Sequence, residues 1–203
     1  MVSKAEKHLL KDKVFKDLVK NLDPLDLPQS GNVFNELVKN IVYQQISYKA
    51  ADNIYARFLI LIKKKKYKPK DVIALSHDEL RSVGLSNQKA IYVKNISEYF
   101  IEKRLLRRNW DKFEDQEIIK ILSDIKGVGV WTVQMILLFE LQRPDVFPYG
   151  DLAIQQSIKE LYNLDGEKKE LIKQMNKVAD NWKPYRSMAT LYLWSWKREQ
   201  SKK

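Results

Sequence analysis

The sequence predicts an all-α fold. Apolar residues recur at the three- and four-residue spacing of amphipathic helices along nearly the whole chain. Turn-forming residues interrupt that spacing at short intervals, and no segment shows the two-residue alternation of a β-strand. The chain has 203 residues, of which 44% are hydrophobic, so it is long enough to bury a core. We therefore expect roughly ten helices joined by short links.

The expected helices follow one another from residue 34 to residue 194. In chain order, their apolar faces run over residues 34–42, 50–62, 91–100, 118–125, 131–141, 154–161, 171–178 and 188–194. The stretch 131–141 is apolar on most sides, so it is expected to form a central, buried helix. Turn signals separate the segments at residues 23–24, 28–31, 68–69, 86–87, 127, 143–144, 148–150, 165–166 and 184.

The composition favours a polyanionic partner. Lys and Arg number 37 against 26 Asp and Glu, which gives a formal net charge of +11. Such an excess on a chain of this size indicates nucleic acid; the alternative is a lysine-rich chain whose positive surfaces are solvated. The same alternatives apply to the run Lys63–Lys66, which Lys68 and Lys70 continue. It follows a predicted helix, where cations are favourable, and is either solvated or in contact with phosphate.

Several classes of protein are excluded or disfavoured. The chain has no cysteine, which excludes disulfides, thiolate zinc sites and cysteine-ligated iron–sulfur clusters. It has two histidines, His8 and His77, which argues against a zinc enzyme. No apolar run approaches the ~18 residues of a membrane span, and the N-terminal segment lacks the apolar core of a signal peptide. We expect an intracellular protein without a membrane segment, in the cytoplasm or nucleoid if the cell is prokaryotic.

Two glycines, Gly127 and Gly129, lie one residue apart where a predicted apolar helix begins. Glycine permits positive φ and lets another backbone approach closely. The start of a helix carries unpaired N–H groups and a partial positive charge, which suit a phosphate. A helix, a Gly-Val-Gly turn and a second helix therefore indicate a grip on a DNA backbone that reads no bases. The alternative is that the glycines only shape a tight turn.

A carboxylate follows about twenty residues later. Asp151 ends the segment Val146–Asp151 and lies where the N-cap of the next predicted helix belongs, so a plain helix cap is its default interpretation. Pro148 and Gly150 would fix the loop and expose the carboxylate. Trp131, and Trp194 near the C-terminus, add large aromatic rings, although aromatics at helical spacing usually belong to a core.

These residues carry a family resemblance. The segment 125–132, Ile-Lys-Gly-Val-Gly-Val-Trp-Thr, followed by Asp145-Val-Phe-Pro148 and Asp151, resembles the helix–hairpin–helix DNA glycosylases that have a Gly/Pro-rich loop and an aspartate, the HhH-GPD superfamily. Within it, the chain most resembles the DNA-3-methyladenine glycosylase II branch. Three further stretches agree: Gln44-Gln-Ile-Ser-x-Lys-Ala-Ala51, Gly84-Leu-Ser-x-x-Lys-Ala90 and Trp182-x-Pro-x-Arg-Ser-x-Ala189.

The resemblance implies two helical subdomains with the active-site cleft between them. Residues 32–143 would form one subdomain, which ends in the helix–hairpin–helix, and residues 1–31 plus 144–203 the other, which carries the aspartate loop. The chain is expected to lack the N-terminal β domain of the larger bacterial enzymes. The implied activity is hydrolysis of the N-glycosidic bond of alkylated bases flipped out of duplex DNA, the first step of base excision repair.

The implied chemistry centres on Asp151. Its carboxylate would stabilise the oxocarbenium-like sugar, or orient and deprotonate the attacking water, and the sequence leaves these two roles open. Bifunctional relatives place a Schiff-base lysine where this chain has Trp131, so a monofunctional glycosylase is expected. The cationic base would stack on Trp131 and Trp194. No cofactor is required and no iron–sulfur cluster is expected.

The resemblance also assigns the DNA contacts. Gln45, Ile46 and Ser47 would form the wedge that fills the gap in the duplex, with Gln45 the first choice; the alternative for Ile46 is core packing. Gly127, Gly129 and Lys126 would bind a phosphate. The carbonyls of Ser123, Ile125 and Val128 match positions that hold a Na⁺ or K⁺ in related hairpins. The expected partner is duplex DNA that contains alkylated bases, bound by a monomer.

The chain departs from the family pattern at four positions. Lys126 stands where many relatives have proline, Gly150 where some have an acidic residue, and Met135 and Leu152 where some have aromatics. Because of Met135 and Leu152, the base pocket is expected to be less aromatic and the substrate range narrower. A non-catalytic helix–hairpin–helix protein that binds lesions is the main alternative, although a pure binder has no need of Asp151. An all-α protein-interaction domain with incidental charge is a third possibility.

Overall fold

The computed structural model describes residues 3–25 and 29–202, and these residues confirm the all-α prediction. The chain is 67% helical and the described residues contain no strand. Its residues separate into two compact units, 1–28 plus 142–203 and 29–141. The boundaries predicted from the sequence, after residues 31 and 143, fall a few residues away from these. The turn signal predicted at Pro28 lies outside the described residues.

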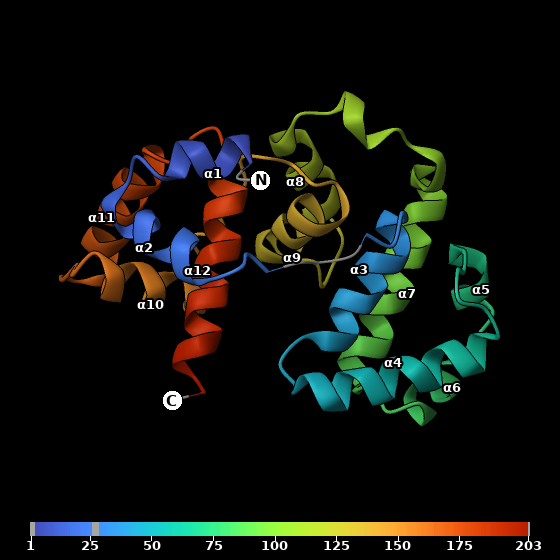
Figure 1. The fold of residues 1–203 in the computed structure, drawn as a ribbon. Coiled ribbons are helices and arrows are strands. Elements are labelled where there is room, and N and C mark those ends of the chain that lie inside the picture. The colour runs from blue at the N-terminus through green and yellow to red at the C-terminus, as the bar shows by residue number, and fades with distance from the viewer. Residues whose placement is uncertain (1–2, 26–28, 203) are drawn as a thin grey trace. The chain divides into compact units, whose positions relative to one another are not determined.

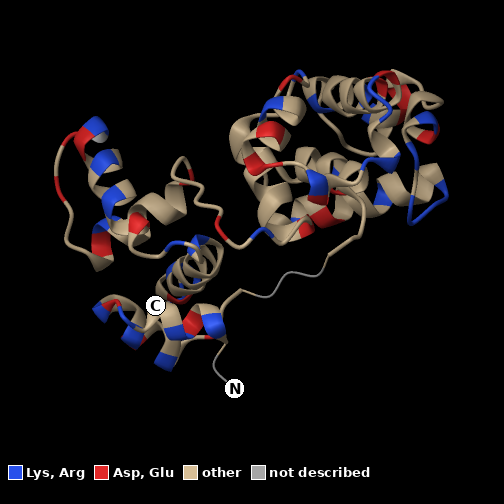
Figure 2. Ribbon diagram, turned by 90° about the horizontal axis from the view of Figure 1, so that it is seen from above, with Lys and Arg blue, Asp and Glu red and all other residues tan. Residues whose placement is uncertain are grey.

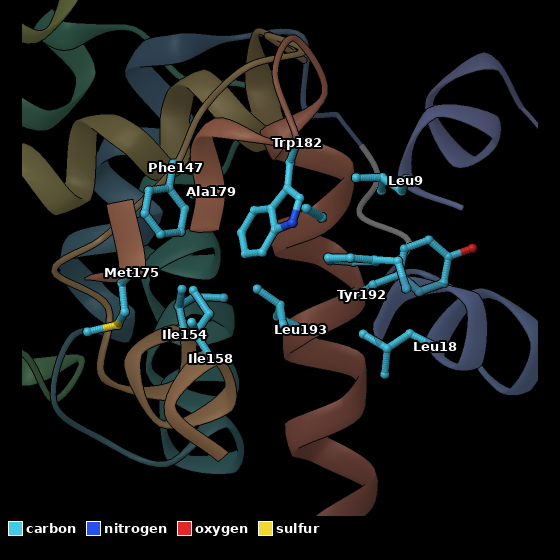
Figure 3. Packing of buried hydrophobic residues seen from close by; sticks show 12 residues of the cluster. Leu9, Leu18, Phe147, Ile154, Ile158, Met175, Ala179, Trp182, Tyr192 and Leu193 are labelled. Atoms are coloured by element: carbon cyan, nitrogen blue, oxygen red, sulfur yellow. The ribbon is translucent and has the colours of Figure 1, made fainter. Parts of the chain in front are cut away.

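The discontinuous unit contains the helices from both ends of the chain (Figure 1). These are α1 (Lys4–Leu9), α2 (Lys13–Asn21), α10 (Leu152–Leu161), α11 (Lys168–Asp180) and α12 (Arg186–Gln200). Their apolar faces meet around Trp182, which is fully buried (Figure 3). The rings of Phe15, Phe147 and Tyr162 lie 5.3, 5.9 and 6.1 Å from the Trp182 ring, centroid to centroid. This aromatic core anchors both α10 and α12.

The continuous unit holds the remaining helices. These are α3 (Val33–Tyr43), α4 (Tyr48–Ile62), α5 (Pro69–Ile73), α6 (His77–Ser82), α7 (Asn87–Glu102), the short 3₁₀ turns η1 (Leu105–Arg107) and η2 (Trp110–Lys112), α8 (Asp115–Ser123), α9 (Val130–Met135) and the π-helical η3 (Ile136–Glu140). Phe34, Leu37, Val38, Ile41 and Val42 are all buried, so the predicted apolar face of α3 is confirmed. α3 and α7 pack side by side in this unit.

The segment 131–141 differs from its prediction in two ways. It is α-helical only to Met135 and continues as a π-helix, in which the Leu141 amide donates to the Ile136 carbonyl at 2.9 Å. Most of it is buried, but Trp131 keeps 39% of its surface exposed. A stretch that is apolar on nearly every side has no polar face to fix its rotation, so the sequence could not reveal either feature.

Charge is distributed over both units. Lys and Arg are intermixed with Asp and Glu in both units (Figure 2), so the net charge of +11 is not confined to one of them. In the run Lys63–Lys66, Lys63 ends α4 in the left-handed region and Lys64 pairs with Asp71 at 2.5 Å. All four lysines are exposed, as both interpretations of this run require. No described helix is long and apolar enough to cross a membrane.

Candidate functional site

Asp151 is the N-cap of α10, as the sequence predicts. Its Oδ1 atom accepts hydrogen bonds from the Ile154 amide at 3.0 Å and from the Trp194 indole N–H at 3.1 Å. These two bonds fix the position of that oxygen at the start of α10. The residues beside it are apolar and exposed: Tyr149 is 47% and Leu152 is 67% accessible. The carboxylate thus accepts from two donors at the start of α10, and exposed apolar residues stand near it in the sequence.

The loop that carries Asp151 is held by its own backbone and by its flanking residues. The Asp151 amide donates to the Pro148 carbonyl at 2.8 Å, and the Tyr149 amide donates to the Phe147 carbonyl at 2.9 Å. The Gln155 side-chain amide donates to the Tyr149 carbonyl at 2.7 Å. These bonds fix the carboxylate relative to α10, which is the rigidity that a charged catalytic group requires.

An ion pair ties the start of this loop to α12. Arg186 Nε donates to Asp145 Oδ1 and one Arg186 terminal nitrogen donates to Oδ2, both at 2.8 Å. The Val146 amide also donates to Ser187 Oγ at 2.9 Å. The two motif segments that contain Asp145 and Arg186 were recognised in the sequence, but not as partners. The sequence offered one signal for this pairing: Asp145 and Arg186 have opposite charges, and neither had another assigned role.

Trp194 lies on α12, partly buried, and contacts Asp151 rather than only the core. Its indole N–H points to the carboxylate, and the remainder of the ring packs against the buried cluster around Trp182. Trp131 is on α9, in the other unit, and is 39% exposed. The alternative that both tryptophans are ordinary core residues is therefore wrong for Trp131. Their assignment to a base pocket stays a prediction.

The Gly-Val-Gly turn connects α8 to α9, and its two glycines have different environments. Gly127 has φ 105°, and a Cβ there would lie 2.2 Å from Cγ of Tyr92. Gly129 is the N-cap of α9 with φ −90°, and a Cβ there would have no atom of the described residues within 4 Å beyond its chain neighbours. The protein's own packing thus requires glycine at 127 but not at 129. Open space at a helix start is what an approaching phosphate needs.

The other hairpin positions are partly engaged within the turn. Lys126 has an exposed side chain, and its carbonyl accepts from Asn95 Nδ2 at 3.0 Å. Ile125 and Val128 are buried, and the Val128 amide donates to the Ile125 carbonyl at 2.9 Å. Carbonyl oxygens suit a monovalent cation, and a second lone pair remains on an oxygen that accepts one bond. The described residues contain no His, Cys, Asp and Glu cluster that could hold a metal ion.

The predicted wedge is the turn between α3 and α4. Gln45 is exposed and has φ 57°, a left-handed conformation that is uncommon for residues other than glycine. Ile46 is 38% exposed, so the alternative of core packing is wrong. Ser47 instead caps α4, and its hydroxyl accepts from the Ala50 amide at 3.3 Å. The side chains of Gln45 and Ile46 are therefore exposed on this turn, while Ser47 joins the turn to the start of α4.

Comparison with known proteins identifies the family. Residues 38–184 match the family described as the HhH-GPD superfamily of base excision DNA repair proteins. The chain belongs to the HhH-GPD superfamily. It is 35% identical to YfjP of Bacillus subtilis, a putative DNA-3-methyladenine glycosylase, over 178 residues, which are 84% of this chain and 60% of that protein. The resemblance noted in the sequence is thereby confirmed.

Two solved structures share this HhH-GPD fold closely. A DNA-3-methyladenine glycosidase from Bacillus halodurans is 33% identical, with a TM-score of 0.84 that covers 99% of this chain and 92% of that one. The 3-methyladenine DNA glycosylase Mag1 of Schizosaccharomyces pombe, in complex with abasic DNA, is 30% identical. Its TM-score is 0.79, and the match covers 95% of both chains. The all-α family fold and the helix–hairpin–helix are therefore established for this chain.

Within this family framework, each unit holds its own group of candidate residues. Asp151 and Trp194 are in hydrogen-bond contact in the discontinuous unit. Trp131, the hairpin and the wedge turn belong to the continuous unit, where Gln44 Nε2 donates to Thr132 Oγ1 at 3.1 Å and so links the wedge turn to α9. That link joins residues 88 positions apart, and no pattern in the sequence indicated it.

Proposed function

We propose that this protein is a monofunctional DNA glycosylase of base excision repair that hydrolyses the N-glycosidic bond of alkylated, 3-methyladenine-type bases. Membership of the HhH-GPD superfamily and the named relatives support the reaction class. The observation that carries the proposal is the Asp151 carboxylate, held by two donors at the start of α10 and flanked by exposed apolar residues. A protein that only binds DNA would not need an anion there.

The reaction requires little acid catalysis. An alkylated purine already carries positive charge, so the bond between its nitrogen and C1′ breaks with the electron pair leaving on a neutral base. The sugar that remains resembles an oxocarbenium ion, which Asp151 stabilises as a fixed negative charge. Water then adds to C1′ and loses a proton, to the carboxylate or to solvent. The products are a free base and an abasic site.

The base must leave the helical stack before this chemistry can occur. We assign that task to the exposed turn of Gln45 and Ile46, whose flanking residues Gln44 and Ser47 are hydrogen-bonded to Thr132 and to the Ala50 amide. Gly129, with Gly127 and Lys126, binds a phosphate through backbone N–H groups and one charge. A Na⁺ or K⁺ at the carbonyls of Ser123, Ile125 and Val128 would strengthen that contact and takes no part in the chemistry.

Two tryptophans give the preference for charged bases. The everted base stacks on the aromatic faces of Trp131 and Trp194, and a cationic ring gains about 0.5–2 kcal/mol from each good contact. Trp131 also stands where a lyase would carry its Schiff-base lysine, so the strand is left intact. The protein works as a monomer on duplex DNA inside the cell, in the cytoplasm or nucleoid if that cell is prokaryotic.

A release assay tests the proposal. Purified protein is incubated with methylated duplex DNA, free bases are separated by chromatography, and strand breaks are counted before and after alkali. We expect release of 3-methyladenine, with breaks that appear only after alkali. Strand cleavage without alkali would contradict the monofunctional assignment. DNA binding without any base release would favour the second candidate, a lesion-binding protein. The exposed wedge turn is compatible with that candidate as well.

A further inference from the structure

Helix α7 sends two lysine side chains to the carbonyl ends of other helices in its unit. Lys89 Nζ donates to the carbonyls of Val42, at 2.8 Å, and Gln44, at 2.6 Å. Lys94 Nζ donates to the carbonyls of Ile73, at 2.8 Å, and Leu75. The last carbonyls of a helix lack partners within it and carry partial negative charge, so an ammonium there is favourable. The two lysines thus make the same kind of contact in two places.

Lys89 contacts the end of α3, directly before the wedge turn. Val42 is in the last turn of α3 and Gln44 is its C-cap, directly before Gln45. Lys89 is partly buried, and loss of hydration lowers its pKa. The hydrogen bonds to the Val42 and Gln44 carbonyls hold its amine against the backbone of this turn.

Gln44 is held on three sides. Its amide donates to the Asn40 carbonyl at 3.1 Å, its carbonyl accepts from Lys89, and its side chain donates to Thr132 of α9. The next residue, Gln45, has φ 57°, which costs of order 1 kcal/mol for a residue with a Cβ. Such a conformation persists where neighbouring contacts over-determine it, and here the contacts on Gln44 do so.

We propose that Lys89 is a positioning residue for DNA penetration: its two hydrogen bonds hold the turn of Gln45 and Ile46 in the conformation that enters the duplex. The inference rests on the proposed function, because it assigns a role within base eversion. The inference goes beyond the proposed function because it names a residue outside the assigned contacts with the base and the sugar. Lys89 lies 44 positions after Gln45 in the sequence and acts on it only through the backbone of α3 and Gln44.

Lys94 supplies the matched control. It lies on the same helix and donates to two carbonyls at the end of α5 and just beyond it, a helix with no place in the proposed DNA contacts. Lys89→Met and Lys94→Met each remove one ammonium and two hydrogen bonds to backbone carbonyls. Any general cost of losing such a cap is therefore common to both variants.

The experiment compares these variants with the parent in two measurements. One is the fluorescence rise of a 2-aminopurine placed beside an abasic site in a duplex, which reports unstacking. The other is single-turnover release of 3-methyladenine from methylated DNA, duplex and single-stranded. We expect Lys89→Met to slow unstacking and duplex release by roughly ten- to a hundredfold, because small misplacements of a positioning group have effects of that size. Single-strand release, which needs no wedge, and every rate of Lys94→Met stay within about twofold of the parent.

Equal rates for Lys89→Met and Lys94→Met in duplex would overturn the inference, as would equal losses in duplex and single strand. If the parent releases no base from any DNA, the proposed function fails, while the fluorescence comparison still decides the role of Lys89. Should Lys89→Met not fold, Lys89→Gln replaces it and is judged by the same criteria.

Discussion

Two carboxylates of the discontinuous unit accept the same kinds of hydrogen bond but differ in the side chains around them. Asp12 is the N-cap of α2, accepts from the Val14 amide at 2.8 Å, and accepts from the Trp182 indole N–H at 3.2 Å. Asp151 is the N-cap of α10 and likewise accepts from a backbone amide and a tryptophan. A cap aspartate paired with an indole is thus present twice in one unit.

The surroundings separate the two carboxylates. Asp12 also accepts from the Tyr162 hydroxyl at 2.7 Å, and its indole partner is fully buried in the core. Burial first, and then the bond to Asp12, raise the pKa of Tyr162, so that hydroxyl remains a donor. Asp151 has exposed apolar neighbours and a partly exposed tryptophan instead. Both carboxylates are half-buried, so a cap amide and an indole donor do not by themselves mark a catalytic acid; the other side chains around each carboxylate distinguish the two.

The largest expected effect is the difference between the asparagine variants of the two aspartates. Asp151→Asn should lower base release by at least about a hundredfold, because the charge that stabilises the sugar cation is lost. Its amide oxygen can still accept from Ile154 and Trp194, so stability and DNA binding should be retained. Asp12→Asn should do the reverse: it lowers the free energy of unfolding by roughly 1–3 kcal/mol and leaves release per folded molecule unchanged. Thermal unfolding and single-turnover release measure both.

A smaller effect concerns the tryptophan faces. Trp194→Ala should lower release of cationic purines by about 2- to 30-fold more than release of neutral ones, which corresponds to ~0.5–2 kcal/mol of cation–π attraction. Defined duplexes with one 7-methylguanine or one hypoxanthine provide the comparison. Equal losses for the two bases would remove the cation–π argument and leave Trp194 as a partner of Asp151 only.

The indole N–H groups give a finer comparison. Trp194→Phe keeps an aromatic face but removes one donor to Asp151, and release should fall about two- to tenfold. Trp182→Phe removes the matching donor to Asp12 and should change stability alone, by about 1–3 kcal/mol. If Trp194→Phe lost stability but no activity, Asp151 would resemble Asp12 after all.

The smallest expected effect concerns the two hairpin glycines, one of which is required by packing while the other faces open space. Gly127→Ala should destabilise the protein by roughly 1–3 kcal/mol, because its φ is positive and Tyr92 occupies the space of a Cβ. Gly129→Ala should leave stability nearly unchanged and weaken duplex binding by a few-fold, since its space is open. Binding titrations at two salt concentrations would show whether a phosphate contact is affected.

The sequence predicted elements well where periodicity was strong. The faces of α3 and α10, and the cap at Asp151, were all confirmed. Helices α1 and α2 were not identified. The six residues of α1 provide little periodic signal. The apolar residues of α2, Val14, Phe15, Leu18 and Val19, do follow helical spacing, and that signal was overlooked. The π-helix that begins at Ile136 was also missed.

Contacts between distant residues were the main gap in the candidate site. The bond from Trp194 to Asp151 spans 43 positions, and those from Lys89 to Val42 and Gln44 span 47 and 45. No local pattern encodes such pairs, because they depend on how separate helices pack. The motifs placed each residue at a turn or helix end, and only the fold shows what each side chain touches there.

The most direct test of the role of Asp151 is the affinity for two abasic-site analogues in duplex DNA. One carries a cationic pyrrolidine that imitates the charged sugar of the transition state, and the other carries a neutral tetrahydrofuran. Complementarity to a cationic transition state predicts that the parent and Asp12→Asn bind the cationic analogue at least about tenfold more tightly, while Asp151→Asn binds both analogues equally. A preference that survives in Asp151→Asn would contradict the account.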